Sequence, residues 1–240
     1  MNILAIGNSF SEDATRYLHQ IARADGERIN VVSLYIGGCS LERHYRNMLS
    51  DGRAYELQYN GQKTGFPVSL SEALLNREWD VVTIQQQSSR SASKETFYPY
   101  VTDLVAFVRK CVPKAKIYFH QTWAYEDESK MLFELTPYKS FKEMADSVIN
   151  TYSEVAQEQN ADGIIPCGQV MAALLDNGIP KIHRDTFHAS FGIGRYALAL
   201  TWYKTLTGRS VLGNSFSDFD EPITDSDAET VKNCVEKVVN

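Results

Sequence analysis

Short apolar runs alternate with amphipathic segments along the whole chain, and this alternation restricts the fold more than any other feature. The first run, Asn2 to Ile6, is apolar after its first residue, as expected of a strand buried on both faces of a sheet. Strands that alternate with helices predict a parallel sheet with helices on both faces. We expect five strands, at residues 2–6, 29–36, 79–85, 116–120 and 163–165.

The segments between these strands predict the helices of the two outer layers. The clearest helix spans Tyr138 to Gln157, where apolar residues recur at helical spacing. Others are expected at residues 12–24, 41–49, 70–76, 97–111, 169–175, 190–206 and 225–238. Residues 51–67 indicate a loop or an irregular hairpin, and residues 124–137 a polar loop. The sequence therefore predicts a single α/β domain over residues 1–240, a three-layer α/β/α sandwich around a mainly parallel, five-stranded sheet.

The cysteines and the charge exclude several kinds of protein. The four cysteines (Cys39, Cys111, Cys167 and Cys234) are widely spaced and form no C-x-x-C pair, which argues against the common zinc and redox motifs and for buried free thiols. A net charge of −6 without a run of Lys or Arg argues against a nucleic-acid partner.

No apolar stretch approaches the roughly 18 residues that a membrane span requires, so no membrane partner is expected. The opening residues MNILAIGNSF lack the basic start of a signal peptide, and the sequence as it stands is expected to be cytoplasmic. A protein whose signal peptide had been replaced by a single methionine would look the same, and its location would then be periplasmic or secreted. The oligomeric state stays open.

Ser9 lies at the junction of the first strand and the helix that follows. This junction lifts a side chain to the carboxyl edge of a parallel sheet, where ligands bind in such folds. Gly7 permits a sharp turn there, and backbone N–H groups at the start of the helix favour developing negative charge. Ser9 is thus a candidate nucleophile, although a serine before a helix is more often a cap.

Asp185-Thr186-Phe187-His188 offers the partners that a serine nucleophile needs. A hydroxyl requires a general base, and the base requires an orienting group. The Asp-x-x-His spacing can supply both from one turn of chain. Of the other histidines, His19 and His44 fall on expected helices, and His120 ends a strand and could line the pocket.

Donors for an oxyanion are expected at the ends of the second and third strands. Gly37-Gly38 would let the backbone N–H of Gly38 approach a substrate closely, and Gln85 offers a side-chain amide. Taken singly, the glycines fit an ordinary turn and the glutamines a solvated loop. Together, at the ends of successive strands, they favour an oxyanion hole.

This arrangement resembles the SGNH (GDSL-like) hydrolase superfamily, and within it a poorly characterised bacterial branch that opens with I-G-N-S-F-S. The resemblance spans nearly the whole chain and implies an SGNH/flavodoxin-like fold. Ser9, Gly38, Asp185 and His188 match the superfamily's places for the nucleophile, the second-block glycine and the terminal D-x-x-H. It also implies that the backbone N–H groups of Ser9 and Gly38 bind the oxyanion.

Two blocks depart from the superfamily's pattern. The first reads Gly-Asn-Ser-Phe instead of Gly-Asp-Ser, and Ile84-Gln85-Gln86-Gln87-Ser88 replaces the expected G-x-N-D. The second block is similar to the W-x-Q-G-E-S block of sialate- and xylan-type acetylesterases, in which glutamine takes the role of the asparagine. On that alignment Gln85 is the third oxyanion donor, and Gln87 is the alternative.

The resemblance implies a serine esterase that needs no cofactor and no metal. The glutamine exchange favours removal of small acyl groups, such as acetyl, from a carbohydrate. Gln121, Trp123 and Tyr125 follow the fourth strand and are expected to contact the substrate, although such aromatic residues equally often pin a loop. The alternatives are a lipid or thioester hydrolase of the same fold and a non-catalytic glycan-binding protein. A metal site formed by His183, Asp185 and His188 is a distant third.

Two further motifs lack the context that their chemistry needs. Residues 213–217 repeat Gly-Asn-Ser-Phe-Ser, but no strand precedes them. Residues 192–197 match a loose dinucleotide-binding pattern outside a βαβ unit. The glycines of the second segment are expected to allow close packing behind His188.

Overall fold

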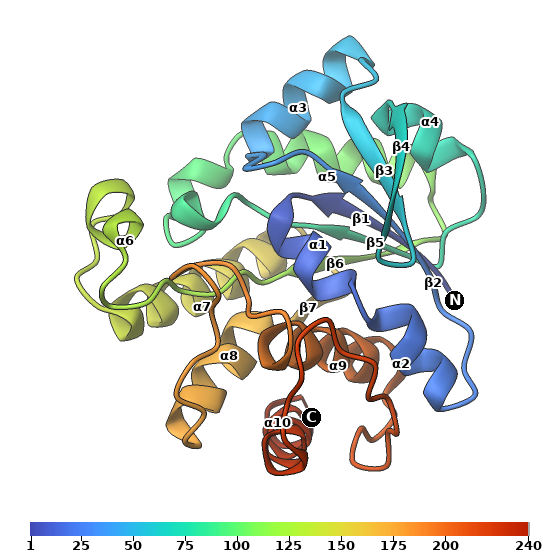
Figure 1. Cartoon of the computed structure of the whole chain (residues 1–240). Helices are drawn as coiled ribbons and strands as arrows, with labels where there is room; N and C mark the ends of the chain where they lie inside the picture. The colour runs from blue at the N-terminus through green and yellow to red at the C-terminus, as the bar shows by residue number, and fades with distance from the viewer. Residues whose placement is uncertain (240) are drawn as a thin grey trace.

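A seven-stranded sheet forms the centre of the protein in the computed structural model, which describes residues 1–239 (Figure 1). The strand order is β4-β3-β2-β1-β5-β6-β7. The strands are β1 (Asn2–Gly7), β2 (Asn30–Tyr35), β3 (Tyr55–Tyr59), β4 (Gln62–Val68), β5 (Val81–Ile84), β6 (Lys116–His120) and β7 (Gly163–Ile165). All five expected strands are present, and the α/β fold is confirmed.

The five strands β2-β1-β5-β6-β7 run parallel, with β1 flanked by β2 and β5. Residues Ile3 to Ile6 of β1 are buried on both faces, as a central strand requires. The chain passes from β1 to β2 on one side and then crosses to β5 on the other. This reversal is a topological switch point, and the crevice for a ligand lies beyond the carboxyl ends of β1 and β5.

Of the two alternatives expected at residues 51–67, the irregular hairpin is confirmed: β3 and β4 pair antiparallel and extend the sheet beyond β2. The expected count of five strands is therefore wrong. The turn of the hairpin is Asn60-Gly61, both with positive φ (50° and 78°), a sequence and conformation that favour a two-residue hairpin turn. Gly61 meets the backbone of Arg16, whose guanidinium Nη1 donates to the Gly61 carbonyl at 3.2 Å.

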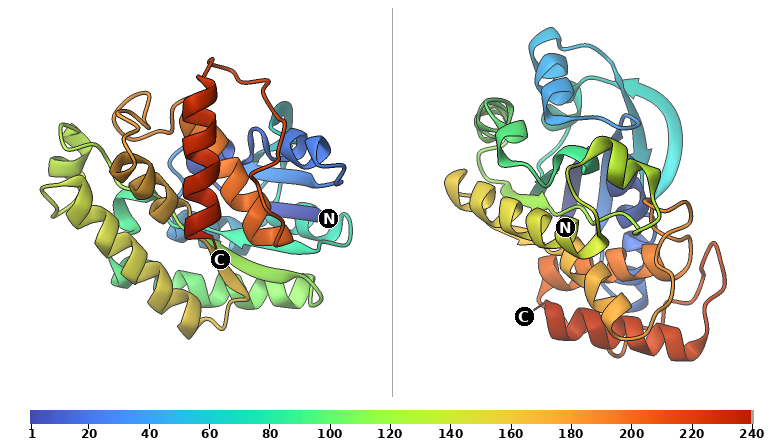
Figure 2. Two further views of the ribbon diagram at one scale, coloured as in Figure 1. Left: turned by 90° about the horizontal axis from the view of Figure 1, so that it is seen from below. Right: turned by 90° about the vertical axis from the view of Figure 1, so that its left-hand side faces the viewer.

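Helices cover both faces of the sheet. On one face lie α3 (Leu41–Ser50), α4 (Leu70–Leu75) and α5 (Tyr100–Cys111), and on the other α1 (Ser9–Thr15), α2 (Leu18–Ala24) and α9 (Ile193–Thr207) (Figure 1). The long α7 (Phe141–Glu158) contacts α8 (Cys167–Asp176), and α10 (Asp225–Val238) lies on the outer side of α8 and α9 (Figure 2). No helix within residues 1–239 is both long and apolar enough to cross a membrane.

Two expected elements differ in the structure. The helix expected at residues 12–24 is divided into α1 and α2, and the interruption at Arg16 and Tyr17 lies where the hairpin turn contacts the chain. The loop expected at residues 124–137 contains a short helix, α6 (Lys130–Leu135).

The contact between the hairpin turn and Arg16 predicts unequal effects for two glycine substitutions in the same hairpin. A Cβ atom on Gly61 would lie 2.3 Å from the Arg16 carbonyl oxygen, whereas one on Gly65, with a similar φ of 74°, would have no described atom within 4 Å. Gly65→Ala should therefore lower the free energy of unfolding by about 1–2 kcal/mol, the cost of the left-handed backbone. Gly61→Ala should lower the free energy of unfolding by about 1–3 kcal/mol more than Gly65→Ala does, because of the steric overlap. Urea denaturation followed by circular dichroism measures both, and equal losses would contradict the packing of the turn on Arg16.

Candidate active site

Ser9, His188 and Asp185 form a continuous hydrogen-bonded chain at the carboxyl edge of the sheet. The Oγ of Ser9 lies 2.8 Å from His188 Nε2, and His188 Nδ1 lies 2.8 Å from Asp185 Oδ2. Because a carboxylate only accepts hydrogen bonds, Nδ1 of the neutral imidazole carries the proton and Nε2 can accept from the Ser9 hydroxyl. Ser9 and His188, 179 positions apart in the sequence, are thus brought within hydrogen-bonding distance of each other.

The Asp185 carboxylate is held in its ionised form. Partial burial raises its pKa, but hydrogen bonds from the His188 ring and backbone N–H, with the charges of His188 and Arg184, bring the pKa below the usual value. The backbone bond joins His188 N to Asp185 Oδ1 at 2.8 Å. An ionised carboxylate in this place orients the imidazole and stabilises it when it becomes protonated.

Asn8 joins the three segments that surround Ser9. Its Oδ1 accepts from the backbone N–H of Phe10 at 3.0 Å, which caps α1, and from Gln85 Nε2 at 2.7 Å. Its Nδ2 donates to the Cys39 carbonyl oxygen at 3.0 Å. An aspartate could not make this last bond, which gives a physical reason for Gly-Asn-Ser in place of Gly-Asp-Ser.

The three consecutive glutamines after β5 have different roles. Gln85 is buried, and its Oε1 accepts from His120 Nδ1 at 2.8 Å while its Nε2 is bound to Asn8. Burial lowers the pKa of His120 to about 3, so this histidine is neutral. Gln86 Oε1 accepts from the backbone N–H groups of Leu41 and Gln87, both at 2.9 Å, and so ties the start of α3 to the end of β5.

Gln87 is the glutamine whose amide faces the loop after β2. A Cβ atom on Gly38 would lie 4.0 Å from Gln87 Nε2, and Gly38 has a φ of 60°. Gln87 is half-buried, whereas the side chain of Gln85 is used inside the core. The geometry therefore contradicts Gln85 as an oxyanion donor and favours the alternative, Gln87.

A buried carboxylate connects the helix of Ser9 with the loop of His188. Asp13, one turn after Ser9 in α1, is fully buried and accepts from Arg184 Nη1 at 3.0 and 2.9 Å and from Arg195 Nε at 2.9 Å. Arg184 directly precedes Asp185, so this network fixes the loop to the helix. Sequence reasoning missed Asp13, although a charged residue one turn after a candidate nucleophile on an otherwise packed helix was a usable signal.

Thr186 is a second feature that the sequence did not reveal. It has a φ of 72°, a conformation that a β-branched residue rarely adopts, between Asp185 and His188. Its carbonyl oxygen accepts from Glu126 N and its Oγ1 donates to Ser129 Oγ, both at 2.9 Å. Strained backbone of this kind persists only where the surroundings hold it, and it is concentrated at functional sites.

The expected substrate contacts of Gln121, Trp123 and Tyr125 are contradicted, because all three side chains are fully buried. Trp123 stacks on Phe10 with ring centroids 4.0 Å apart and donates to the Phe187 carbonyl oxygen at 2.8 Å. Gln121 Oε1 accepts from the backbone N–H of Gln169, and Tyr125 shares a 2.7 Å hydrogen bond with Ser88. These residues support the site from inside the protein.

The structural surroundings explain the three remaining sequence features, which are the possible metal site, residues 192–197 and the repeated motif. Within residues 1–239, no three His, Cys, Asp or Glu side chains are grouped as a metal site would require. The close packing expected of residues 192–197 is confirmed, since a Cβ atom on Gly194 would lie 2.7 Å from the Ile182 carbonyl oxygen. In the repeated motif Asn214 accepts from Phe216 N at 3.1 Å, as Asn8 does from Phe10, but this segment follows no strand.

Comparison with known proteins assigns the chain to a family. The profile of the family described as "Domain of unknown function (DUF4886)" matches residues 2–237. The chain belongs to the DUF4886 family. The crystal structure of a DUF4886 protein from Bacteroides uniformis ATCC 8492 shares 30% identity with a TM-score of 0.94, over 100% of this chain and 94% of that one. No curated protein matches this chain.

Two more distant structures share the fold of this DUF4886 protein. One, from Slackia heliotrinireducens, is described as a candidate SGNH hydrolase, with 22% identity and a TM-score of 0.62 over 86% of this chain and 98% of that one. The other is an acetylxylan esterase from Geobacillus stearothermophilus, with 14% identity and a TM-score of 0.57 over 85% and 92%. The fold is therefore that of the SGNH hydrolases, while the narrower branch that opens with I-G-N-S-F-S stays a prediction.

The hydrogen bonds of Asn8 predict that its removal affects both stability and the site. Asn8→Ala leaves buried polar partners unpaired and should lower the free energy of unfolding by about 2–5 kcal/mol. Asn214→Ala is a matched control, because Asn214 is also buried and makes two comparable bonds within the repeated motif. Denaturation should show a loss of stability for both variants, whereas hydrolase activity should fall only in Asn8→Ala. An equal fall in activity would contradict the assignment of the site to the first motif.

Proposed function

We propose that this DUF4886 protein is a serine esterase of the SGNH type, with Ser9 as the nucleophile. The observation that carries the proposal is the chain of two 2.8 Å contacts from Ser9 Oγ through His188 to Asp185. Such a chain is the arrangement that activates a hydroxyl for attack on a carbonyl. A glycan-binding protein would have no need of it.

In the proposed reaction the Ser9 oxygen attacks the ester carbonyl carbon while its proton passes to His188 Nε2. Asp185 stabilises the imidazolium that forms. Collapse of the tetrahedral intermediate breaks the bond to the alcohol, which takes the proton from His188 and leaves an acyl group on Ser9. Water, deprotonated by His188, then attacks the acyl carbon. The bond from that carbon to Ser9 Oγ breaks, His188 returns the proton to Oγ, and the acid is released. No cofactor or metal takes part in these steps.

The oxyanion donors in this proposal are the backbone N–H groups of Ser9 and Gly38 and the side-chain amide of Gln87. The first N–H groups of a helix have no partner within the helix, and Ser9 is the first residue of α1. The left-handed backbone of Gly38 and the nearby Gln87 amide support the other two donors.

For the substrate we propose a small acyl group, such as acetyl, on a carbohydrate. The support is the glutamine in place of the usual asparagine, together with fold neighbours that are described as acetylxylan esterases. A lipid or thioester hydrolase of the same fold is the alternative, and it predicts faster turnover of long acyl chains.

Hydrolysis of p-nitrophenyl esters tests the proposal. Wild-type protein should hydrolyse the acetate faster than the octanoate, and Ser9→Ala should lose at least about 10³-fold of this activity, because the nucleophile is gone. Ser215→Ala, at the same place in the repeated motif, should retain wild-type rates. Equal rates in wild type and Ser9→Ala would contradict the proposal, and a preference for octanoate would favour the lipid hydrolase.

The roles of the two glutamines predict opposite effects on rate and stability. Gln87→Ala should lower kcat by about 10²–10³-fold, as expected for one oxyanion donor, and change the free energy of unfolding by less than about 0.5 kcal/mol. Gln85→Ala removes one of the three hydrogen bonds of Asn8 and the partner of His120 Nδ1, and it should lower the free energy of unfolding by about 1–3 kcal/mol. Steady-state kinetics and urea denaturation of both variants measure this. An unchanged kcat in Gln87→Ala would contradict the assignment of Gln87 as an oxyanion donor.

A further inference from the structure

Gln86, the middle glutamine after β5, is fully buried and uses every hydrogen-bonding position of its side-chain amide. Its Oε1 accepts from the backbone N–H groups of Leu41 and Gln87, both at 2.9 Å. Its Nε2 donates to the carbonyl oxygen and to Oγ1 of Thr96, at 2.8 and 3.2 Å. An amide has two acceptor and two donor positions, so this side chain has one defined orientation.

The two bonds to Oε1 join the chain segments that carry two of the proposed oxyanion donors. Leu41 begins α3, three residues after Gly38, and Gln87 directly follows Gln86. Gly38 is exposed, and as a glycine it has no side chain to hold it. The direction of its backbone N–H therefore depends on how the neighbouring residues of the loop are fixed.

Asn8 binds the same loop. Its Nδ2 donates to the carbonyl oxygen of Cys39, the residue after the oxyanion glycine, at 3.0 Å. Asn8 directly precedes Ser9, as Gln86 directly precedes Gln87. A buried amide thus stands immediately before each of the two donors outside the glycine loop, and both amides bind that loop.

Gln86 is itself fixed by segments outside the site. Its backbone N–H donates to the hydroxyl of Tyr152, a fully buried residue of α7, at 3.1 Å. Thr96 lies in a short 3₁₀ helix, Lys94–Phe97, and its Oγ1 donates to the Arg90 carbonyl oxygen at 2.7 Å. The position of Oε1 is therefore set by the fold and does not depend on a bound substrate.

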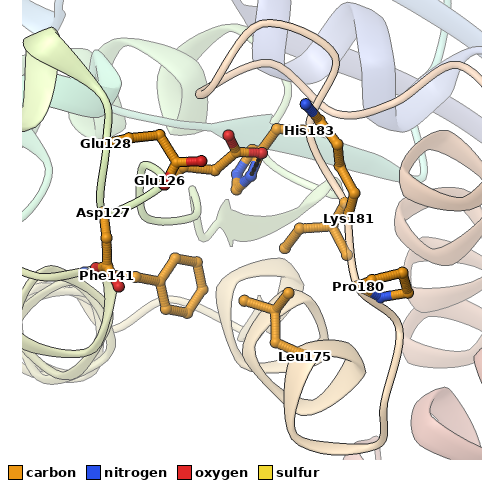
Figure 3. A pocket seen from close by; sticks show the side chains of 9 residues that line it. Glu126, Asp127, Glu128, Phe141, Leu175, Pro180, Lys181 and His183 are labelled. Atoms are coloured by element: carbon orange, nitrogen blue, oxygen red, sulfur yellow. Dashed lines mark hydrogen bonds and ion pairs between the residues drawn. The ribbon is translucent and has the colours of Figure 1, made fainter.

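The loop of His188 is held by a separate set of contacts. Behind this loop Glu126 lies beside His183, with Glu126 Oε1 3.3 Å from His183 Nδ1 (Figure 3). The backbone N–H of Glu126 donates to the Thr186 carbonyl oxygen at 2.9 Å. The hydrogen bonds of Gln86 reach none of these residues. A change at Gln86 should thus affect the oxyanion donors and leave the base in place.

We propose that Gln86 is a positioning residue of the oxyanion hole, whose Oε1 holds the Gly38 loop and Gln87 at a fixed spacing. This inference rests on the proposed esterase function. Oxyanion donors stabilise the transition state only when they point at the place where the negative charge develops. Gln86 acts through its neighbours, so its loss should lower kcat more than it changes KM.

Steady-state kinetics with p-nitrophenyl acetate test the proposal on wild type, Gln86→Met, Gln87→Ala and the double variant. Methionine has a similar length but cannot hold the two N–H groups, so Gln86→Met should lower kcat at least about tenfold and change KM less than about threefold. The double variant should lose less than the product of the two single losses, because Gln86 acts partly through Gln87. Gln159→Met is the matched control, since Gln159 is also buried and its Nε2 donates to Thr102 Oγ1 at 3.2 Å, outside the site. It should keep the wild-type kcat.

Amide hydrogen exchange followed by NMR tests the contacts without any ester. The amides of Leu41 and Gln87 should be protected in wild type and should exchange at least about tenfold faster in Gln86→Met. The amide of Phe10, which is bound to Asn8, should not change. Unprotected Leu41 and Gln87 amides in wild type would overturn the proposal even if Gln86→Met does not fold.

Three kinetic outcomes would also overturn the proposal. A wild-type kcat in Gln86→Met would show that the donors are positioned without Gln86. A double-variant loss equal to the product of the single losses would show that Gln86 does not act through Gln87, and an equal loss in Gln159→Met would show general destabilisation. Equal hydrolysis by wild type and Ser9→Ala would instead contradict the esterase proposal, and the exchange rates would still decide whether Gln86 holds the two segments.

Discussion

The rest of the site depends on the hydrogen bonds that the side-chain amide of Asn8 makes. One buried group caps the helix of Ser9, binds Gln85 at the end of β5 and binds the loop after β2 through Cys39. The three strand ends around the switch point are therefore held at fixed distances by hydrogen bonds that need both a donor and an acceptor. The packing of Gly7 adds a steric requirement, since a Cβ atom there would lie 2.2 Å from Ser11 Oγ and 2.8 Å from Gln85 Oε1.

The acid–base loop is fixed from two sides. On one side the Asp13 carboxylate binds Arg184 and Arg195, and removing one partner from such a buried pair typically costs about 3–5 kcal/mol. On the other side Glu126 and Ser129 hold Thr186 in its left-handed conformation. The 2.8 Å contact between Ser9 and His188 is thus built into the fold.

Much of the fold could be predicted because the parallel strands are short and mostly apolar. The hairpin of β3 and β4 was less evident, since β4 is largely exposed at the edge of the sheet and lacks an apolar run. Its clearest signal was Asn60-Gly61, a pair that favours two-residue hairpin turns. The division of α1 from α2 depends on a contact with that turn, which no local pattern contains.

The candidate triad could be predicted because Ser9, Asp185 and His188 each stand in a distinctive local context. The choice between Gln85 and Gln87 could not be predicted. The two side chains are identical, and only the path of the chain after β5 decides which way each one points. Trp123 and Tyr125 likewise follow a strand, but tertiary packing places them in the core instead of on the surface.

The most direct test of the account is the mass of the intact protein after reaction with diisopropyl fluorophosphate, a reagent that phosphorylates activated serines. The account predicts one diisopropylphosphoryl group per chain, located by peptide mapping on Ser9 and absent from Ser9→Ala. An unmodified wild-type protein, or a modification that persists in Ser9→Ala, would contradict the claim that Ser9 is the activated nucleophile.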